Sequence, residues 1–167
     1  GDISADIGLK APKNIKDSSH DQIVICPTSG KKRKNWLPSR FIALSHGLKA
    51  IDNKCVFVME PSSLVEWTHR LRGHAEIAQT SSLADLAKII FSSKMVVCND
   101  SGSAHLGSAL GKKVICIIAR RNTDYLWRPG WTPAILVTPS MPSHAIPRLW
   151  PYLISAEKVL DRIQHAL

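Results

Sequence analysis

The chain has 167 residues, of which 44% are apolar and 21% are charged, a composition typical of one soluble globular domain. Its formal net charge of +9 predicts attraction to phosphate-bearing partners, but charge alone does not choose among nucleotides, nucleic acid, anionic lipids and phosphorylated saccharides. No apolar run approaches the roughly 20 residues of a membrane-spanning helix. No signal-peptide pattern is found either. The cysteines fall in or beside apolar runs, which favours reduced thiols and a cytoplasmic protein over disulfides.

Residues 1–21 are polar and lack sustained periodicity, which predicts a linker or docking tail. From Gln22 onward, short β-branched runs alternate with longer amphipathic stretches, and we predict one domain over residues 22–167. Strands are predicted at Gln22–Cys26, Cys55–Met59, Met95–Cys98, Val114–Ile118 and Ile135–Thr138, with a weaker strand at Ala75–Ala78. Helices are predicted at Pro38–Ile51, Ser62–Arg72, Ser82–Phe91, Ser103–Leu110 and Ser155–Ala166.

The predicted strands are nearly continuous in apolar residues, as parallel strands are when helices cover both faces of a sheet. We therefore expect a doubly wound, mostly parallel open α/β sheet of Rossmann-like type. Six prolines between Pro129 and Pro151 predict an irregular segment before the last helix. The cysteines lie in or beside apolar runs and are expected to be reduced core residues: Cys26, Cys55, Cys98 and Cys116.

The first candidate site segment follows the first predicted strand and ends at Trp36. Thr28 and Ser29 supply hydroxyls, and the basic run from Lys31 to Lys34 follows directly. Such a loop can hold phosphate oxygens and offset the negative charge that develops on a departing diphosphate. The alternative interpretation is a solvated basic loop, because runs of charge usually are solvated.

The second candidate segment follows the strand that ends at Cys98 and contains Asp100, Ser101, Gly102, Ser103 and His105. Its small residues let backbone N–H groups approach an anion at the start of a helix, where the helix dipole adds positive charge. A diphosphate fits such a site. The alternative is an ordinary capped helix, with Asp100 or Ser101 as N-cap and His105 as a packed first-turn residue.

Together the two segments resemble glycosyltransferase family 9, the lipopolysaccharide heptosyltransferases. Residues 27–41, with Pro27-Thr28-Ser29 and Lys34-Asn35-Trp36, look like the first motif of that family's donor domain. Asp100-Ser101-Gly102 followed by His105 looks like its second motif, an Asp-Thr-Gly with His at the same spacing. The two motifs occur in the expected order, and the resemblance covers about residues 22–135, including Asp124, Trp127 and Pro129.

The resemblance implies the C-terminal, donor-binding domain of a GT-B glycosyltransferase that binds a nucleoside diphosphate sugar such as ADP-heptose. It matches Thr28, Ser29 and Lys34 to phosphate contacts, and Asp100, Ser101, Gly102, Ser103 and His105 to the diphosphate and sugar cluster. Glu60 lies near the position of a carboxylate that binds the ribose hydroxyls, with Glu66 as an alternative. Ser81 lies near a position that contacts the base.

The family's reaction displaces the nucleoside diphosphate from the anomeric carbon with inversion, and the acceptor is a lipopolysaccharide or related saccharide. Lys34, the Ser101–Ser103 amides and Arg120 or Arg121 are the candidates for stabilising the leaving group. The general base comes from an N-terminal acceptor domain in this family, so we expect the isolated chain to bind nucleotide weakly and to transfer nothing. No metal or cofactor is expected. Peripheral contact with the inner face of the inner membrane is a further expectation, because the acceptors are lipid-linked.

The sequence also departs from the family's pattern. The first loop is one residue longer and more basic, which leaves open whether Lys32, Arg33 or Lys34 is the phosphate ligand. Ser101 replaces the usual Thr, and residues 119–124 lack the usual Gly-Pro-Thr. These departures leave the subfamily and the donor sugar open.

Other classes of function fit the sequence less well. A basic nucleic-acid-binding module is the main alternative, but no helix-turn-helix, RRM or OB pattern supports it. A dinucleotide-binding oxidoreductase is disfavoured because no Gly-x-Gly-x-x-Gly follows the first strand. Six histidines lack metal-ligand spacing: His20, His46, His69, His74, His144 and His165. The tryptophans are expected in core or interdomain packing: Trp36, Trp67, Trp127, Trp131 and Trp150.

Overall fold

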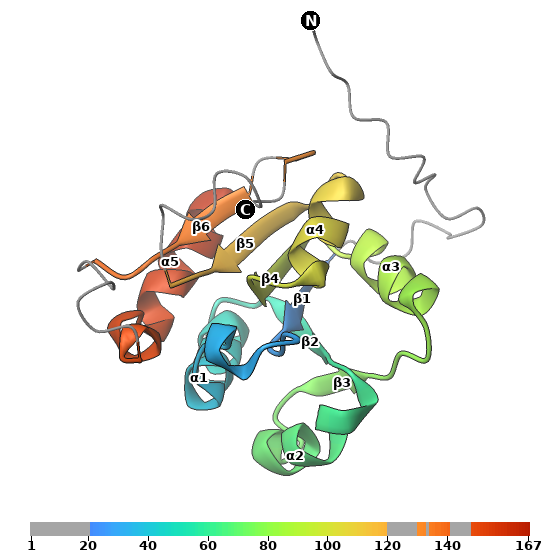
Figure 1. The fold of residues 1–167 in the computed structure, drawn as a ribbon, viewed down its shortest axis with the longest axis horizontal. Coiled ribbons are helices and arrows are strands. Elements are labelled where there is room, and N and C mark those ends of the chain that lie inside the picture. Colours follow the sequence, from blue (N-terminus) through green and yellow to red (C-terminus); the bar gives the residue numbers. More distant parts are fainter. Residues whose placement is uncertain (1–20, 120–129, 133, 141–147) are drawn as a thin grey trace, which may run out of the picture.

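A computed structural model describes residues 21–119, 130–132, 134–140 and 148–167. The described strands form one parallel sheet of six, in the order β3-β2-β1-β4-β5-β6 (Figure 1). Their bounds are β1 Gln22–Cys26, β2 Lys54–Val58, β3 Glu76–Ala78, β4 Met95–Asn99, β5 Lys113–Ile117 and β6 Ala134–Val137. The order of strands reverses beside β1, so a crevice is expected at the carboxyl ends of β1 and β4.

Helices cover both faces of the sheet (Figure 1). The described helices are α1 Pro38–Ala50, α2 Pro61–Leu71, α3 Leu83–Phe91, α4 Gly102–Ala109 and α5 Ala156–Ala166. Two short 3-10 helices, η1 Lys32–Lys34 and η2 Trp150–Leu153, lie outside the sheet. The predicted doubly wound architecture is confirmed, and each predicted strand or helix end lies within one residue of the observed one. Neither 3-10 helix was predicted.

Two apolar clusters, one on each face, hold the helices against the sheet. Alternate strand residues such as Ile25 and Phe57 pack with side chains of α1, α2 and α5. The intervening residues, such as Val24 and Val96, pack with α3 and α4. Because side chains of a strand alternate between faces, an apolar run without polar interruption buries both faces at once.

Three of the cysteines are buried and unbonded, as predicted. Cys26, Cys98 and Cys116 share one register level on β1, β4 and β5. Burial raises the pKa of Cys26 to about 11, so its thiol is protonated at neutral pH. Cys55 is unbonded too but only partly buried.

The tryptophans divide between the core and the surface. Trp36, Trp67 and Trp150 are buried, which confirms the predicted packing role for these three. Trp131 is 42% exposed and is not a core residue of this domain, so for Trp131 only the interdomain role stays a prediction. Trp127 lies outside the described residues.

Some predicted features have no described counterpart. Several predicted positions lie outside the described residues: residues 1–20 of the proposed tail, Arg120, Arg121, Asp124 and, within the proline-rich segment, Pro129, Pro133 and residues 141–147. Among the helices that the structure describes, none has both the length and the apolar character required to span a bilayer.

Candidate functional site

Two adjoining pockets lie at the carboxyl ends of β1, β2 and β4. The larger has a volume of about 690 Å³ and the smaller about 380 Å³. Both are bordered by Thr28, Glu60, Ser103, Leu83 and Leu86. Eight predicted site residues line one or both pockets: Thr28, Ser29, Glu60, Ser81, Ser101, Gly102, Ser103 and His105. The structure therefore brings these eight predicted residues together at one edge of the sheet.

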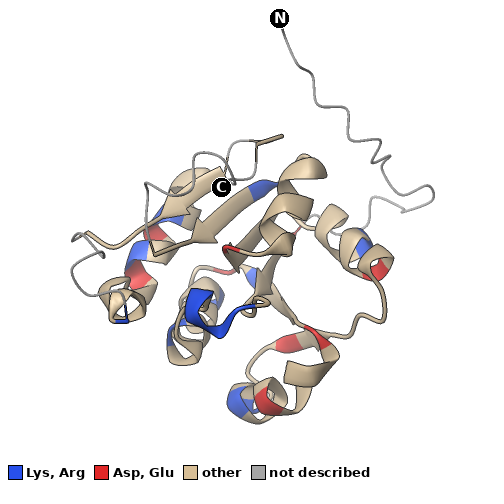
Figure 2. Ribbon diagram, viewed as in Figure 1, with Lys and Arg blue, Asp and Glu red and all other residues tan. Residues whose placement is uncertain are grey.

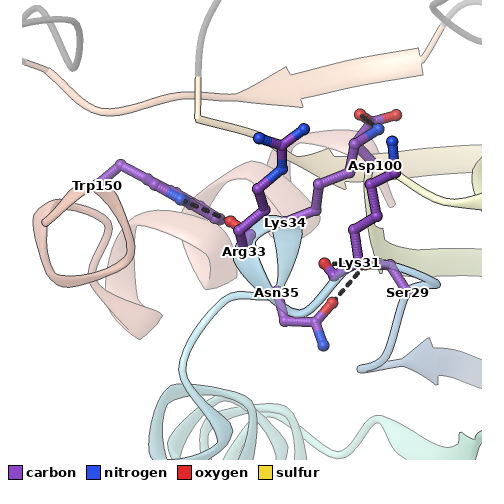
Figure 3. A network of polar contacts seen from close by, with 7 residues as sticks. All are labelled: Ser29, Lys31, Arg33, Lys34, Asn35, Asp100 and Trp150. Atoms are coloured by element: carbon purple, nitrogen blue, oxygen red, sulfur yellow. Dashed lines mark hydrogen bonds and ion pairs between the residues drawn. The ribbon is translucent and has the colours of Figure 1, made fainter. Parts of the chain in front are cut away.

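The remaining two predicted residues, Lys34 and Asp100, line neither pocket and instead bind each other. Lys34 Nζ lies 2.5 Å from Asp100 Oδ2, and the two side chains are 40% and 35% exposed. Asp100 directly precedes Ser101, which lines the larger pocket. The ion pair thus links the basic loop to the start of α4 (Figure 3).

Hydrogen bonds hold the backbone of the basic loop, while Lys31, Lys32 and Arg33 are exposed to solvent as the alternative interpretation expected. The Ser29 hydroxyl lies 2.6 Å from Asn35 Oδ1 and 3.0 Å from the Lys31 carbonyl oxygen. Trp150 Nε1 donates to the carbonyl of Arg33 at 3.2 Å. Figure 2 shows that the loop nevertheless presents Lys and Arg on η1, and Figure 3 shows the side-chain ends of Lys31, Arg33 and Lys34 on one side of it.

A buried asparagine joins the two candidate loops, and sequence reasoning gave it no role. Asn99 is 0% exposed at the end of β4. Its Nδ2 donates to the carbonyl of Pro27, and its Oδ1 accepts from the backbone N–H of Trp36, both at 2.8 Å. The available signal was a polar residue at the end of an otherwise apolar strand, where a buried amide needs partners.

The start of α4 leaves polar groups unused. Ser101 is the N-cap residue, as one alternative predicted, but its side chain makes no capping hydrogen bond. Its Oγ is buried without a partner among the described residues. The backbone N–H groups of Gly102 and Ser103 have no partner in this part of the chain either. Since the first N–H groups of a helix point outward along its axis, they are available to an anion in the larger pocket.

His105 and Trp131 form one wall of the larger pocket. Their ring centroids lie 6.5 Å apart at a near-perpendicular angle. Ser108 Oγ holds the Trp131 segment by bonding both the N–H and the carbonyl of Thr132 at 2.8 Å. His105 is therefore a pocket residue, not only a packed first-turn residue.

Glu60 is the polar centre of both pockets. Thr28 Oγ1 donates to Glu60 Oε2 at 2.5 Å, and Ser63 Oγ donates to Oε1 at 2.9 Å. Burial acts to raise the pKa of Glu60, but hydrogen bonds from Thr28, its own backbone N–H and Ser63 outweigh burial and hold that pKa below its ordinary value. Glu66, the alternative carboxylate, pairs with Arg70 on α2 and lines neither pocket.

Ser81 lies at the start of α3 and lines the smaller pocket. Its hydroxyl donates to Asp85 Oδ2 at 2.7 Å, and the Ser82 hydroxyl donates to the same oxygen at 2.8 Å. These two hydrogen bonds are the main cause of an Asp85 pKa below the ordinary value. The backbone N–H of Asp85 donates back to Ser82 Oγ at 3.1 Å, which caps the helix.

The arrangement suits an anionic ligand that also carries hydroxyl groups. Helix N–H groups and nearby cations can take the anion, and the Glu60 carboxylate can accept hydrogen bonds from a diol. In the described ranges, no group of three or more His, Cys, Asp and Glu side chains is placed to hold a metal ion.

Comparisons with known proteins give one family and one fold. The family model for glycosyltransferase family 9 (heptosyltransferase) matches residues 3–138. An E. coli heptosyltransferase WaaC structure with ADP has a TM-score of 0.77 at 18% identity, covering 92% of this chain and 47% of that one. A family 9 glycosyltransferase of Veillonella parvula has a TM-score of 0.74 at 20% identity, covering 90% and 47%. E. coli ADP-heptose lps heptosyltransferase II has a TM-score of 0.72 at 16% identity, covering 89% and 46%.

These structural likenesses support the fold, and the chain spans slightly less than half the length of each of the three structures. No curated protein sequence matches the chain.

Proposed function

Because the chain belongs to glycosyltransferase family 9, we propose that it is the nucleotide-sugar-binding domain of an inverting glycosyltransferase. The donor is a nucleoside diphosphate sugar of the ADP-heptose type, and the acceptor is a lipopolysaccharide or related saccharide. One observation carries this proposal: the two motif loops and Glu60 meet around adjoining pockets at the sheet's switch point. The comparisons add no support for the nucleic-acid-binding alternative.

The diphosphate binds at the start of α4. Gly102 and Ser103, whose backbone N–H groups are free, line the larger pocket, where the helix dipole favours negative charge. The Ser101 hydroxyl is buried beside them without a partner among the described residues. A methyl group built on Gly102 meets nothing within 4 Å in the chain, so the space beside that backbone is open to a ligand. Lys34 completes the site when its ammonium turns from Asp100 to a phosphate oxygen.

The ribose binds at Glu60, which is ionised at neutral pH and borders both pockets. A carboxylate can accept hydrogen bonds from both hydroxyls of a vicinal diol. The base then occupies the smaller pocket, which has apolar walls from Val58, Met59 and Leu86 and a hydroxyl at Ser81.

Transfer requires a base for the acceptor hydroxyl and stabilisation of the leaving diphosphate. The proposed donor site supplies the second requirement through the α4 amides and Lys34. The base comes from an N-terminal acceptor domain, as the family resemblance implies, so the 167-residue chain binds donor without transferring sugar. The reaction needs no metal or cofactor. It takes place in the cytoplasm, at the inner face of the inner membrane where a lipid-linked acceptor is present.

Calorimetric titration with ADP, GDP, UDP and a random oligonucleotide at fixed salt tests the proposal. We expect saturable binding of one diphosphate, and Lys34→Gln to weaken it about tenfold or more, because charged hydrogen bonds to phosphate are strong. Lys49→Gln, an equal charge change on α1 away from both pockets, is the matched control and should bind like the wild type. Oligonucleotide binding without nucleotide preference would instead support the nucleic-acid-binding alternative.

Gly102→Ala provides a second test that leaves the fold intact. The added methyl group meets no neighbour in the chain, and Ala favours a helix over Gly. We expect unchanged or raised thermal stability together with weaker diphosphate binding. Unchanged binding would exclude close backbone approach of the diphosphate at this position.

A further inference from the structure

The ion pair between Lys34 and Asp100 places opposite charges where the proposed donor diphosphate must bind. The 2.5 Å contact occupies the Lys34 ammonium, and it leaves a carboxylate directly before the diphosphate-binding start of α4. A negatively charged ligand therefore competes with Asp100 for Lys34 and is repelled by the Asp100 charge. The two side chains are partly exposed, so a ligand can reach them.

The structure holds the backbone around this pair while leaving the carboxylate free to change partner. Asn99 is fixed by its two buried hydrogen bonds, and Ser101 begins α4 on the other side. Lys34 is the one hydrogen-bond or ion-pair partner of the Asp100 side chain within the described residues. Once Lys34 turns to a phosphate, Asp100 therefore needs new hydrogen-bond donors.

A donor sugar supplies such donors through its own hydroxyl groups, whereas the hydroxyl groups of a nucleoside diphosphate are those of the ribose, which the proposed site binds at Glu60. The free diphosphate also carries about one more negative charge than the sugar-bearing form at neutral pH, since its terminal phosphate titrates near pH 6. Hydrogen bonds from the sugar thus offset the cost of opening the ion pair when the nucleoside diphosphate sugar binds. The nucleoside diphosphate offers no such compensation.

We propose that the Lys34–Asp100 ion pair makes the site select the complete nucleoside diphosphate sugar over the nucleoside diphosphate that remains after transfer. This inference rests on the proposed donor-binding function. Asp100 exchanges Lys34 for sugar hydroxyls when the donor binds. After the sugar has left, Asp100 again competes with the phosphate for Lys34, which weakens the hold on the product and favours its release.

The test compares two affinities in three proteins. For the base identified by titration, the dissociation constants of the nucleoside diphosphate and of its glucose or mannose conjugate are measured for the wild type, Asp100→Asn and Asp161→Asn. Asp161 on α5 provides the same change in net charge away from both pockets.

In Asp100→Asn we expect diphosphate affinity to rise about five- to tenfold, as removal of one nearby charge in a largely aqueous setting predicts. The sugar conjugate should gain less or lose affinity, so its advantage over the diphosphate shrinks. Asp161→Asn should leave that advantage unchanged.

Lys34→Gln keeps the inference testable if Asp100→Asn unfolds. It should weaken the sugar conjugate by a larger factor than the diphosphate, because Asp100 competes for Lys34 only in the diphosphate complex, and equal losses would overturn the inference. Equal strengthening of both ligands in Asp100→Asn, or a wild type that binds both equally, would overturn the inference while leaving donor binding intact. Failure of the wild type to bind any of these nucleotides would instead overturn the proposed function.

Discussion

The two ends of the candidate site are built in different ways. The phosphate end comprises residues 27–36 and 99–103. Besides the local hydrogen bonds of Ser29, its contacts join residues far apart in the chain: Asn99 with Pro27, Trp36 with Ile154, and Trp150 with Arg33. The base end comprises Glu60 and Ser81 to Asp85. Apart from Thr28 with Glu60, its side-chain contacts join residues three or four positions apart on the surface.

This difference matches what the donors of such enzymes share, the diphosphate, and what varies among them, the base and the sugar. Every nucleoside diphosphate sugar carries the same diphosphate. The loops of the phosphate end are fixed to the core by buried hydrogen bonds between distant residues. Bases and sugars differ among donors, and local surface contacts can change without disturbing that core. Substitutions at the phosphate end should therefore lower both stability and nucleotide affinity. Substitutions at the base end should change one of these properties without an equal change in the other.

The largest expected effect is that of Asn99→Ala. It leaves the Trp36 N–H and the Pro27 carbonyl buried without partners, so we expect a loss of about 3 kcal/mol in the free energy of unfolding. Urea denaturation measures this loss. The matched control is Asn53→Ala, which removes a local bond to the Ile51 carbonyl and should cost less than about 1 kcal/mol. Similar losses of unfolding free energy in both variants would contradict a special stabilising role for the buried hydrogen bonds of Asn99.

Trp150→Phe tests the outer support of the same end. It removes the donor to the Arg33 carbonyl and keeps most of the packing, so we expect a loss of about 1 kcal/mol and weaker nucleotide binding. Binding weakens because Lys34 belongs to the same 3-10 helix. Trp67→Phe changes the packing under α2 and should reduce stability without a comparable change in affinity. Equal losses of nucleotide affinity in Trp150→Phe and Trp67→Phe would contradict a role of η1 in positioning Lys34.

Thr28→Val probes the one long-range contact of the base end through pH. The pKa of Glu60 is lowered in the folded chain, so its stabilisation is present above the ordinary value of 4.5 and is lost as pH falls through the lower folded value. We expect Thr28→Val to cost roughly 0.5–1 kcal/mol at pH 7. The difference from wild type should shrink at pH 3 in urea denaturation. A difference independent of pH would assign the loss to packing instead.

Ser82→Ala should have the smallest effect. It removes the N-cap of α3, and we expect a loss of roughly 0.5 kcal/mol, at the low end for such caps. Diphosphate affinity should stay at the wild-type level, measured by calorimetry. A large loss of affinity would show that the base end is not independent of the phosphate end.

Much of the fold could be predicted from the sequence because its signals are local. Apolar β-branched runs define the strands, and the polar residues that directly follow them define the loops at the sheet edge. Glu60 and Glu66 could also have been told apart, since Arg70 lies four residues after Glu66 and completes a helix ion pair.

The contacts that complete the phosphate end could not be predicted. The partner of Asp100 is 66 positions away, and the carbonyl that Trp150 reaches is 117 positions away. No local pattern encodes such pairings, because they arise only when the sheet brings loop ends together. Ser101 does stand at the N-cap position, as one alternative predicted, but its hydroxyl is buried without a partner among the described residues and makes no capping hydrogen bond.

The tryptophan support of η1 bears on how donor domains of this family can be recombined. Trp150 and Ile154 lie beyond residue 138, where the match to the family model ends, yet they hold the carbonyl of Arg33 and the indole of Trp36. A chimera that joins the two motif loops of this chain to the C-terminal segment of a relative would separate each loop contact from its partner. The exchangeable unit therefore extends at least through Ile154, just before α5.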